Sequence, residues 1–365
     1  GLRVGVKHKG RVDAVSEQKI YYRPTGLVFG DDAARMVRDG DALPLAGLTS
    51  IGFTHVDVIS RRSHVIERDM QRLSGVDDSA ALERLSARRP DIAGLSLESA
   101  RVMGIVNVTP DSFSDGGKLT SAELAIAHGR QLASEGADIL DVGGESTRPG
   151  SDTVADDEEL RRVIPVIEGL ARDYLVSVDT RKAAIMQAGL AAGAKIINDV
   201  SALRHDGKAG GVVAKAQAPV ILMHAQGEPK TMQLAPQYDD VLLDVYDALE
   251  ARVAEAEAAG ISRSRIAVDP GIGFGKTFRQ NLDLLAGLTL FHGLGLPLLV
   301  GLSRKGFVGA LTGEKIAGNR IHGSVGGALQ AALAGTHLLR VHDVKATREA
   351  LAVFTAALEP DSADI

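Results

Sequence analysis

Polar residues recur at one kind of position along this chain, directly after short apolar runs. They are Asn107, Asp141, Asp179, Asn198 with Asp199, His224, Asp269, Ser303 to Lys305, and Arg340 with His342. Carboxylates and an amide can pair with the N–H groups of a ligand, whereas Lys305, Arg340 and His342 can neutralise an anion. Arg340 and His342 are two residues apart, which puts both on the same face of a strand. The pattern predicts a polar site that binds an anion.

The segment DPGIGFGKT, from Asp269 to Thr277, ends in the Gly-Lys-Thr of a nucleotide-binding P-loop. The P-loop pattern requires a glycine where this chain has Pro270. Proline lacks an N–H and fixes its own φ, so it cannot take part in wrapping a phosphate. We therefore predict a loop after a strand, with Asp269 at the strand tip and glycines that let the backbone pass close to a ligand. A flexible surface turn is the alternative.

Eight short apolar runs precede these polar residues, and each is followed by a helical pattern. From residue 102 onward they are VMGIVNV, ADILDVGG, LVSVDT, AKIINDVS, PVILMHAQ, RIAVDPGI, PLLVGLSR and HLLRVHDV. Apolar strands that alternate with helices are typical of a parallel sheet covered on both faces. In the first helix, Thr120 and Glu123 can form a capping box and Gly136 supplies the stop. Its apolar face comprises Ala122, Ala125, Ile126, Gly129, Leu132 and Ala133.

Strand–helix units repeated eight times over roughly 250 residues have the size of a TIM barrel. We predict an α/β protein with a TIM (β/α)8 barrel, and an open doubly wound sheet is the alternative. The polar strand ends favour the barrel, because the carboxyl ends of its strands converge on one mouth. The barrel is assigned to residues 102–365. Residues 1–101 are predicted to form a small N-terminal α+β extension of unknown role, with strands in KIYYRPTGLVFG and IGFTHVDVIS.

Composition narrows the classes of protein. The chain has 365 residues, of which 45% are hydrophobic and 24% charged, enough for a large core with an appendage. A formal net charge of −6 argues against a nucleic-acid-binding surface. Cysteine is absent, which excludes disulfides and a thiolate zinc site and predicts a cytoplasmic protein. No long apolar run suggests a membrane span.

Eight motifs, in order, resemble those of the dihydropteroate synthases of the bacterial folate pathway. They are MGIVNVTPDSFSDGG, DVGGESTRPG, SVDT, INDVS, LMHAQG, DPGIGFGKT, GLSRKGF and RVHDV. The resemblance implies a TIM barrel that joins 6-hydroxymethyl-7,8-dihydropterin diphosphate to 4-aminobenzoate and releases pyrophosphate. It also implies Mg²⁺ as cofactor, sulfonamides as inhibitors and a homodimer. The implied chemistry is a dissociative substitution that depends on positioning and electrostatics.

The same resemblance assigns roles to individual residues. The pterin and its diphosphate would be bound by Asp179, Asn198, Met223, Asp269, Lys305, Arg340, His342, Thr147 and Asn107, with the amide of Asn107 on Mg²⁺. The aminobenzoate would be bordered by Thr147, Arg148, Ser303, Lys305, Phe113 and Pro149. The catalytic set would be Lys305, Arg340, His342 and Asp179. The two loops TPDSFSDGG and GESTRPGSDT would close over the diphosphate.

Simpler interpretations remain open for several of these residues. Asp179, Asn198 and Asp269 can each cap the helix that follows, because Asp and Asn often precede helices. Met223 can belong to the core, and the Ser-Arg-Lys sequence at 303–305 can be a solvated cationic turn. His224 is given no role beyond a hydrogen bond that supports a neighbouring site residue.

Two other functions remain as alternatives to the synthase. One is a barrel that transfers a methyl group from a folate to a corrinoid protein. The sites suited to diphosphate and aminobenzoate argue against it. The other is a catalytically silent homologue that only binds pterin, although none of the expected site residues is missing.

Overall fold

Eight parallel strands form a ring within the part of the chain that the structure, a computed structural model, describes: residues 18–108, 121–146, 153–227 and 236–358. The strands are β5 (Arg101–Asn107), β6 (Ile139–Gly143), β7 (Val176–Asp179), β8 (Ile196–Asp199), β9 (Val220–Met223), β10 (Ile266–Asp269), β11 (Leu299–Val300) and β12 (Leu338–Val341). Each strand pairs with the next one along the chain, and the last, β12, pairs with the first, β5. A parallel bridge between Val268 and Leu298 brings β10 beside β11. This confirms the predicted TIM barrel, and the open doubly wound sheet was wrong.

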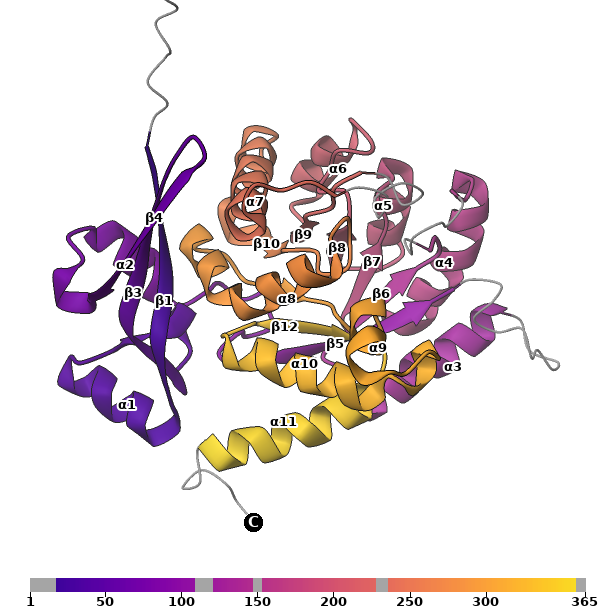
Figure 1. Cartoon of the computed structure of the whole chain (residues 1–365). Helices are drawn as coiled ribbons and strands as arrows, with labels where there is room; N and C mark the ends of the chain where they lie inside the picture. The colour runs from indigo at the N-terminus through magenta and orange to yellow at the C-terminus, as the bar shows by residue number, and fades with distance from the viewer. Residues whose placement is uncertain (1–17, 109–120, 147–152, 228–235, 359–365) are drawn as a thin grey trace, which may run out of the picture.

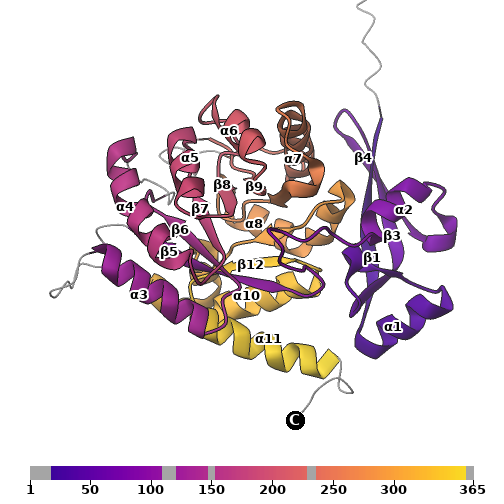
Figure 2. The same cartoon turned by 180° about the vertical axis from the view of Figure 1, so that it is seen from behind.

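Helices surround the ring of strands (Figures 1 and 2). They are α3 (Ser121–Ser134), α4 (Asp156–Leu170), α5 (Ala183–Ala191), α6 (Ala209–Ala216), α7 (Val241–Ala258), α8 (Phe278–Ala286), α9 (Gly306–Thr312), α10 (Ile321–Leu333) and α11 (Val344–Leu358). In α3 the predicted apolar face is confirmed, because Ala125, Gly129 and Leu132 are buried. Gly136 has φ of 102° after its end, whereas Thr120 lies outside the described residues. No helix within the described residues is long and apolar enough to cross a bilayer.

Alternation along the strands sorts the barrel interior into layers. One layer is apolar and comprises Met103, Ile139, Ile196, Ile221, Ala267, Leu299 and Leu338, clustered with Ile92 and Leu97. Two residues further along a strand, the side chain points to the same face again. The next layer therefore comprises Ile105, Asp141, Ser177, Asn198, Met223, Asp269, Gly301 and Arg340. Polar side chains thus follow an apolar floor, on the side of the strands' carboxyl ends.

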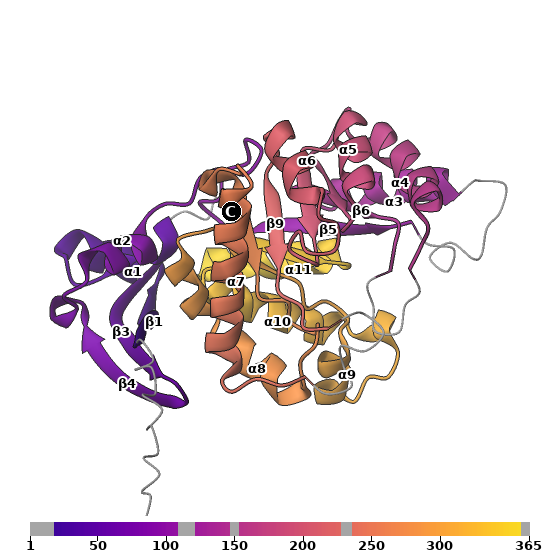
Figure 3. The same cartoon turned by 90° about the horizontal axis from the view of Figure 1, so that it is seen from above.

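The N-terminal extension contains an antiparallel sheet with two helices. Its elements are β1 (Lys19–Phe29), α1 (Gly30–Asp39), β2 (Leu43–Pro44), β3 (Ile51–Arg62), β4 (Val65–Arg72) and α2 (Ser79–Ser86). Strand β3 pairs with β1, β2 and β4, so the two predicted strands, β1 and β3, are confirmed. The sheet has a core of its own around Leu45, Phe53 and Leu85. It lies beside α7 in the view from above (Figure 3).

The sheet is fixed to the barrel by a mixed polar and aromatic contact. Tyr21 of β1 packs edge-on against Tyr246 of α7, with ring centroids 5.4 Å apart. Its hydroxyl donates to Asp247 at 2.9 Å, and Lys19 reaches the same carboxylate at 2.5 Å. Burial raises the pKa of Tyr21 and the Asp247 carboxylate raises it further, so its hydroxyl stays a donor. This contact holds the extension on α7.

Removal of the Tyr21 ring should destabilise the protein. We expect Tyr21→Ala to lower the free energy of unfolding by about 3 kcal/mol, because it empties a fully buried aromatic site. The matched control is Ile20→Ala at the neighbouring position, where 39% of the residue is exposed and the loss should stay near about 0.5 kcal/mol. Urea denaturation of the two variants measures the difference, and equal losses would contradict the packing described for β1.

Candidate active site

A buried cluster around Arg340 occupies the mouth of the barrel. From β12, Arg340 Nε donates to Asp141 Oδ2 on β6 at 2.6 Å, and Nη2 donates to Asp179 Oδ2 on β7 at 2.7 Å. Asn198 of β8 donates to the same Asp141 oxygen at 3.0 Å, and Ser177 Oγ donates to Oδ1 at 2.6 Å. Side chains from four strands are therefore brought together, as the barrel predicted. A guanidinium has five N–H groups, so Arg340 can serve these carboxylates and an anion together.

The Arg340 cluster has two carboxylates for one cation. Burial raises the pKa of Asp179 to about 8; the positive charge of Arg340 opposes this shift and the carboxylate of Asp141 adds to it. Burial alone would lower the pKa of Arg340, but Asp141 and Asp179 raise it, so the guanidinium stays charged. Asp179 can therefore hold a proton near neutral pH, which keeps the buried cluster close to neutral.

Lys305 and Asp269 are two further charged groups at the mouth, and each shifts the pKa of the other. Lys305 Nζ donates to the carbonyl oxygen of Ile272 and lies 4.4 Å from the centroid of the Phe274 ring. Burial lowers the pKa of Lys305 to about 7, and the carboxylate of Asp269 opposes the shift. Burial also raises the pKa of Asp269, against the charge of Lys305. An anion that binds beside Lys305 would favour its charged form.

His342 and Ser303 lie together at the ends of β12 and β11. Ser303 Oγ is 3.1 Å from His342 Nδ1 and accepts from His342 N at 3.2 Å. These bonds orient the imidazole ring. Ser303 is buried, and Arg304 pairs with Asp343 at 2.5 Å, so the solvated-turn interpretation of residues 303–305 was wrong.

The remaining predicted residues divide into two groups. Met223 is buried opposite Asp269 in the β9–β10 register, and Asn107 ends β5 opposite Gly143. Both therefore lie at the mouth. Phe113, Thr147, Arg148 and Pro149 lie outside the described residues.

Helix capping does not account for Asp179. Helix α5 begins after Lys182, with no side-chain cap, and Asp206 accepts from the N–H of Ala183. The carboxylate of Asp179 accepts from Arg340 instead. Nor does Asn198 or Asp269 cap the next helix: α6 begins after Lys208, and α8 has Thr277 as its cap. The capping interpretation was therefore wrong for all three residues.

The Gly-Lys-Thr at the end of the segment DPGIGFGKT has a structural explanation. Thr277 caps α8 in a capping box with Gln280, and Lys276 is only 2% exposed. The Nζ of Lys276 donates hydrogen bonds within the protein, among them to the carbonyls of Gly271 and Phe274. This arrangement excludes a P-loop, as the sequence predicted. The glycines bring the backbone close to the loop after β9 and to Lys305.

A network of ion pairs anchors both flanks of residues 147–152. Glu145 after β6 accepts from Arg181 Nε at 2.8 Å and from the backbone N–H of Val154 at 2.8 Å. Lys182 Nζ lies 3.1 Å from Glu145 and 2.7 Å from Glu159. Burial would raise the pKa of Glu145, but the Val154 N–H and the two cations lower it. The charged network fixes where this loop leaves and rejoins the barrel.

Sequence reasoning missed several of these residues. Asp141 was placed at a strand end but given no role, although a carboxylate inside an apolar run was a signal that it is paired. Glu145, Lys182 and Lys276 gave no such signal, because charged residues in loops are usually solvated. His224 Nδ1 is 3.0 Å from Lys276 Nζ, a residue that is not among the predicted site residues.

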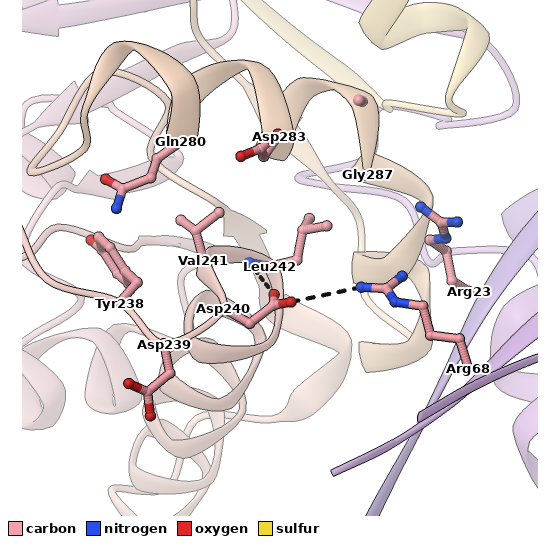
Figure 4. A pocket seen from close by; sticks show the side chains of 11 residues that line it. Arg23, Arg68, Tyr238, Asp239, Asp240, Val241, Leu242, Gln280, Asp283 and Gly287 are labelled. Atoms are coloured by element: carbon pink, nitrogen blue, oxygen red, sulfur yellow. Dashed lines mark hydrogen bonds and ion pairs between the residues drawn. The ribbon is translucent and has the colours of Figure 1, made fainter. Parts of the chain in front are cut away.

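A separate cavity of about 450 Å³ lies between the N-terminal sheet and the barrel (Figure 4). Its lining comprises Arg23, Arg68, Tyr238, Asp239, Asp240, Val241, Leu242, Gln280, Asp283, Ala286 and Gly287. Arg68 Nη2 lies 3.6 Å from Asp240 Oδ2 across it. The site residues predicted from the sequence are not among those that line it, so we place the active site at the barrel mouth.

The stability of the protein should depend on the proton of Asp179. Its pKa is about 8 in the folded state against 3.8 as the ordinary value, so the folded state retains a proton that the unfolded chain loses. The unfolding free energy of the wild type should therefore fall, relative to Asp179→Asn, as pH rises from about 4 to about 8. Urea denaturation at several pH values measures this, with Asp32→Asn at an exposed site of α1 as control. A difference that does not change with pH would contradict the assignment.

Comparison with known proteins agrees with this geometry. Residues 103–342 match the family model described as pterin binding enzyme. The chain is 50% identical over 268 residues to the dihydropteroate synthase of Neisseria meningitidis serogroup B, covering 72% of this chain and 94% of that protein. It resembles the Xanthomonas albilineans dihydropteroate synthase with 4-aminobenzoic acid at a TM-score of 0.70 and 53% identity, covering 74% of this chain and 97% of that one.

The Yersinia pestis dihydropteroate synthase, solved as a complex with a sulfonamide drug, has a TM-score of 0.69 and 47% identity. That match covers 72% of this chain and 97% of the other. Nearly the whole length of each relative is therefore matched, at an identity far above what a shared fold alone requires. The chain belongs to the dihydropteroate synthase family of pterin-binding enzymes.

Proposed function

We propose that this chain condenses 6-hydroxymethyl-7,8-dihydropterin diphosphate with 4-aminobenzoate to give 7,8-dihydropteroate and pyrophosphate. The observation that carries this proposal is the cluster of Arg340, Asp179 and Asn198 at one mouth, in a chain of this family. The cluster contains hydrogen-bond acceptors for the edge of a pterin ring and a positive charge for an anion. Acceptor oxygens can pair with ring N–H groups, and the guanidinium can pair with a phosphate oxygen.

Pterin recognition is assigned to Asp179, Asn198 and Asp269, with Met223 against the ring face. Asn198 donates through Nδ2 to Asp141, and this bond fixes the orientation of the amide. The amide oxygen of Asn198 is then left to accept from the pterin. The N–H of Gly271 donates to the carboxylate of Asp269 at 2.7 Å and holds it in place. Groups held in this way are pre-organised, so little ordering remains when the pterin binds.

The substitution itself requires charge stabilisation rather than a nucleophilic side chain. The bond between the exocyclic methylene carbon and the diphosphate oxygen breaks, and the pterin ring delocalises the positive charge. Arg340 and His342 are assigned to the departing diphosphate, and Lys305 to the pterin and aminobenzoate. The aminobenzoate nitrogen then forms the new carbon–nitrogen bond and loses a proton. Ser303, Thr147, Arg148, Phe113 and Pro149 are assigned to the aminobenzoate side.

Magnesium fits the residues present if the substrate supplies most of its ligands. The described residues contain no group of three or more His, Asp or Glu side chains placed to hold a metal. Asn107 at the end of β5 offers a hard amide oxygen, and Mg²⁺ commonly keeps waters and shares phosphate oxygens. When bound, the ion would neutralise charge on the diphosphate. Asn107 would hold it at the mouth.

Other parts of the proposal concern the molecule as a whole. We propose that residues 1–101 form an appended unit and residues 102–365 the catalytic barrel. The separate antiparallel sheet supports this division, although Ile92 and Leu97 pack into the barrel floor. A homodimer, a cytoplasmic location and inhibition by sulfonamides are further parts of the proposal. The last is supported by the sulfonamide complex of the Yersinia pestis relative.

An assay with defined substrates tests the proposed function. The purified protein is incubated with the pterin diphosphate, radiolabelled 4-aminobenzoate and Mg²⁺, and dihydropteroate is separated by chromatography. We expect product that depends on all three additions. Pterin binding by calorimetry without product would instead identify the silent homologue. Methyl transfer from methyltetrahydrofolate to a corrinoid, tested in parallel, should not occur.

Loss of the Lys305 ammonium should impair turnover without unfolding the barrel. We expect Lys305→Met to lower kcat/KM by about 100-fold, or about 2.7 kcal/mol of transition-state stabilisation, because a charged group at the reacting centre is lost. The control is Lys345→Met on α11, whose side chain is 71% exposed. Steady-state kinetics and circular dichroism measure both effects. Near-normal kcat/KM in Lys305→Met would remove Lys305 from the catalytic set.

The proposed magnesium ligand predicts a separate effect. We expect Asn107→Ala to raise the Mg²⁺ concentration needed for half-maximal activity by about tenfold, since one oxygen ligand is lost. Asn319→Ala, at an exposed position of the 3₁₀ turn Ala317–Asn319, serves as control. Initial rates are measured against Mg²⁺ concentration at saturating substrates. An unchanged Mg²⁺ requirement would assign Asn107 to another role.

A further inference from the structure

Lys276 is a buried lysine for which the proposed chemistry has no use. It lies in the loop between β10 and α8 and ranks among the largest fully buried side chains of the described residues. Its Nζ is 2.9 Å from the Gly271 carbonyl, 2.8 Å from the Phe274 carbonyl and 3.0 Å from His224 Nδ1. These three acceptors match the three N–H donors of a charged lysine. Burial lowers the pKa of Lys276 well below its ordinary value, and the carboxylate of Asp269 opposes this shift.

The acceptors belong to two different loops. Gly271 and Phe274 are in the loop after β10, whereas His224 follows β9, and its own carbonyl lies 3.4 Å from Nζ. Burial, together with the positive charge of Lys276, lowers the pKa of His224 to about 2. The imidazole is therefore neutral and can accept at Nδ1. Lys276 joins the two loops from within.

Backbone packing shows how closely these loops approach each other. A Cβ at Gly271 would lie 1.8 Å from the His224 carbonyl oxygen, and one at Gly275 would lie 2.4 Å from that of Gln226. Both glycines have positive φ, 68° and 63°. Only glycine fits at such a contact, so the loop after β10 has one shape against its neighbour.

The outer side of this loop contacts the catalytic lysine. The carbonyl of Ile272 accepts from Lys305 Nζ, and the Phe274 ring lies 4.4 Å from the same atom. Ile272 lies between Gly271 and Phe274 in the chain, and these are the two residues whose carbonyls accept from Lys276. The position of Lys305 therefore depends on the shape of residues 271–275, and that shape depends on Lys276.

We propose that Lys276 is a positioning residue, whose amine clamps the loop after β10 so that Ile272 and Phe274 present Lys305 to the substrates. The link to turnover rests on the proposed function, in which Lys305 contacts pterin and aminobenzoate. The clamp itself does not, because it follows from contacts within the protein.

Hydrogen exchange tests the clamp independently of any activity. In Lys276→Met the side chain keeps its length but loses all three donors. We expect amide exchange in residues 271–277, followed by mass spectrometry, to become about tenfold faster or more, while the barrel strands exchange as in the wild type. Unchanged exchange in this segment would overturn the proposal. So would faster exchange throughout the barrel, or failure of the variant to fold, since Lys276 would then support the whole fold and not one loop.

Chemical rescue tests the link to turnover. In Lys276→Ala we expect kcat/KM to fall about tenfold or more, and n-propylammonium, which matches the atoms removed, to restore most of it. Trimethylammonium at the same concentration should not, because it cannot donate to three acceptors. The matched control is Thr277→Ala, which removes the cap of α8 but keeps Lys276, and whose activity should not respond to either amine.

The outcomes separate the two proposals. If the wild type makes no dihydropteroate, the proposed function fails while hydrogen exchange still decides on the clamp. If the wild type is active and Lys276→Ala keeps its kcat/KM, or loses it without rescue by n-propylammonium, Lys276 does not position Lys305. Rescue of Lys276→Ala but not of Thr277→Ala supports the proposal.

Discussion

Burial of one guanidinium between two carboxylates is the constraint on which the mouth of the barrel depends. Arg340 bridges Asp141 and Asp179 at 2.6 and 2.7 Å, and these residues come from three different strands. A buried charge is costly unless it is paired and hydrogen-bonded, so the three strands must keep this register. The same requirement leaves one more carboxylate than cation. Burial raises the pKa of Asp179 and the second carboxylate adds to the shift, so this cluster can hold a proton near neutral pH.

Two buried lysines extend this principle to the loops. Lys182 joins Glu145, which follows β6, to Glu159 of α4, and Lys276 joins the loops after β9 and β10. In each case a single lysine Nζ bonds to acceptors from separate segments. Loops need such internal bonds because they lack the regular hydrogen bonds of helices and strands. The two lysines therefore fix the ends of these loops on the barrel.

Much of the fold and part of the site could be predicted from the sequence. The eight apolar runs predicted β5 to β12, because strands buried on both faces must be apolar throughout. Polar residues at their ends predicted that Asp179, Asn198, Asp269 and Arg340 would meet at one mouth. The partners were not predictable: Arg340 and Asp141 are 199 positions apart, and nothing local in the sequence pairs them. Capping was a reasonable alternative for Asp179, since local patterns cannot distinguish a cap from a long-range ion pair.

The sequence by itself determined the order of strands and helices, the apolar floor of the barrel, the polar residues of its mouth and, through its motifs, the family. These properties are local, because they depend on residue type and on a spacing of two or of three to four positions. Only the tertiary structure decided that Lys276 points inward, that Asp141 is the hub of the Arg340 cluster, and that Tyr21 fixes the extension to α7. The reason is physical: burial and pairing depend on which distant segments close around a side chain, and barrel closure sets those distances.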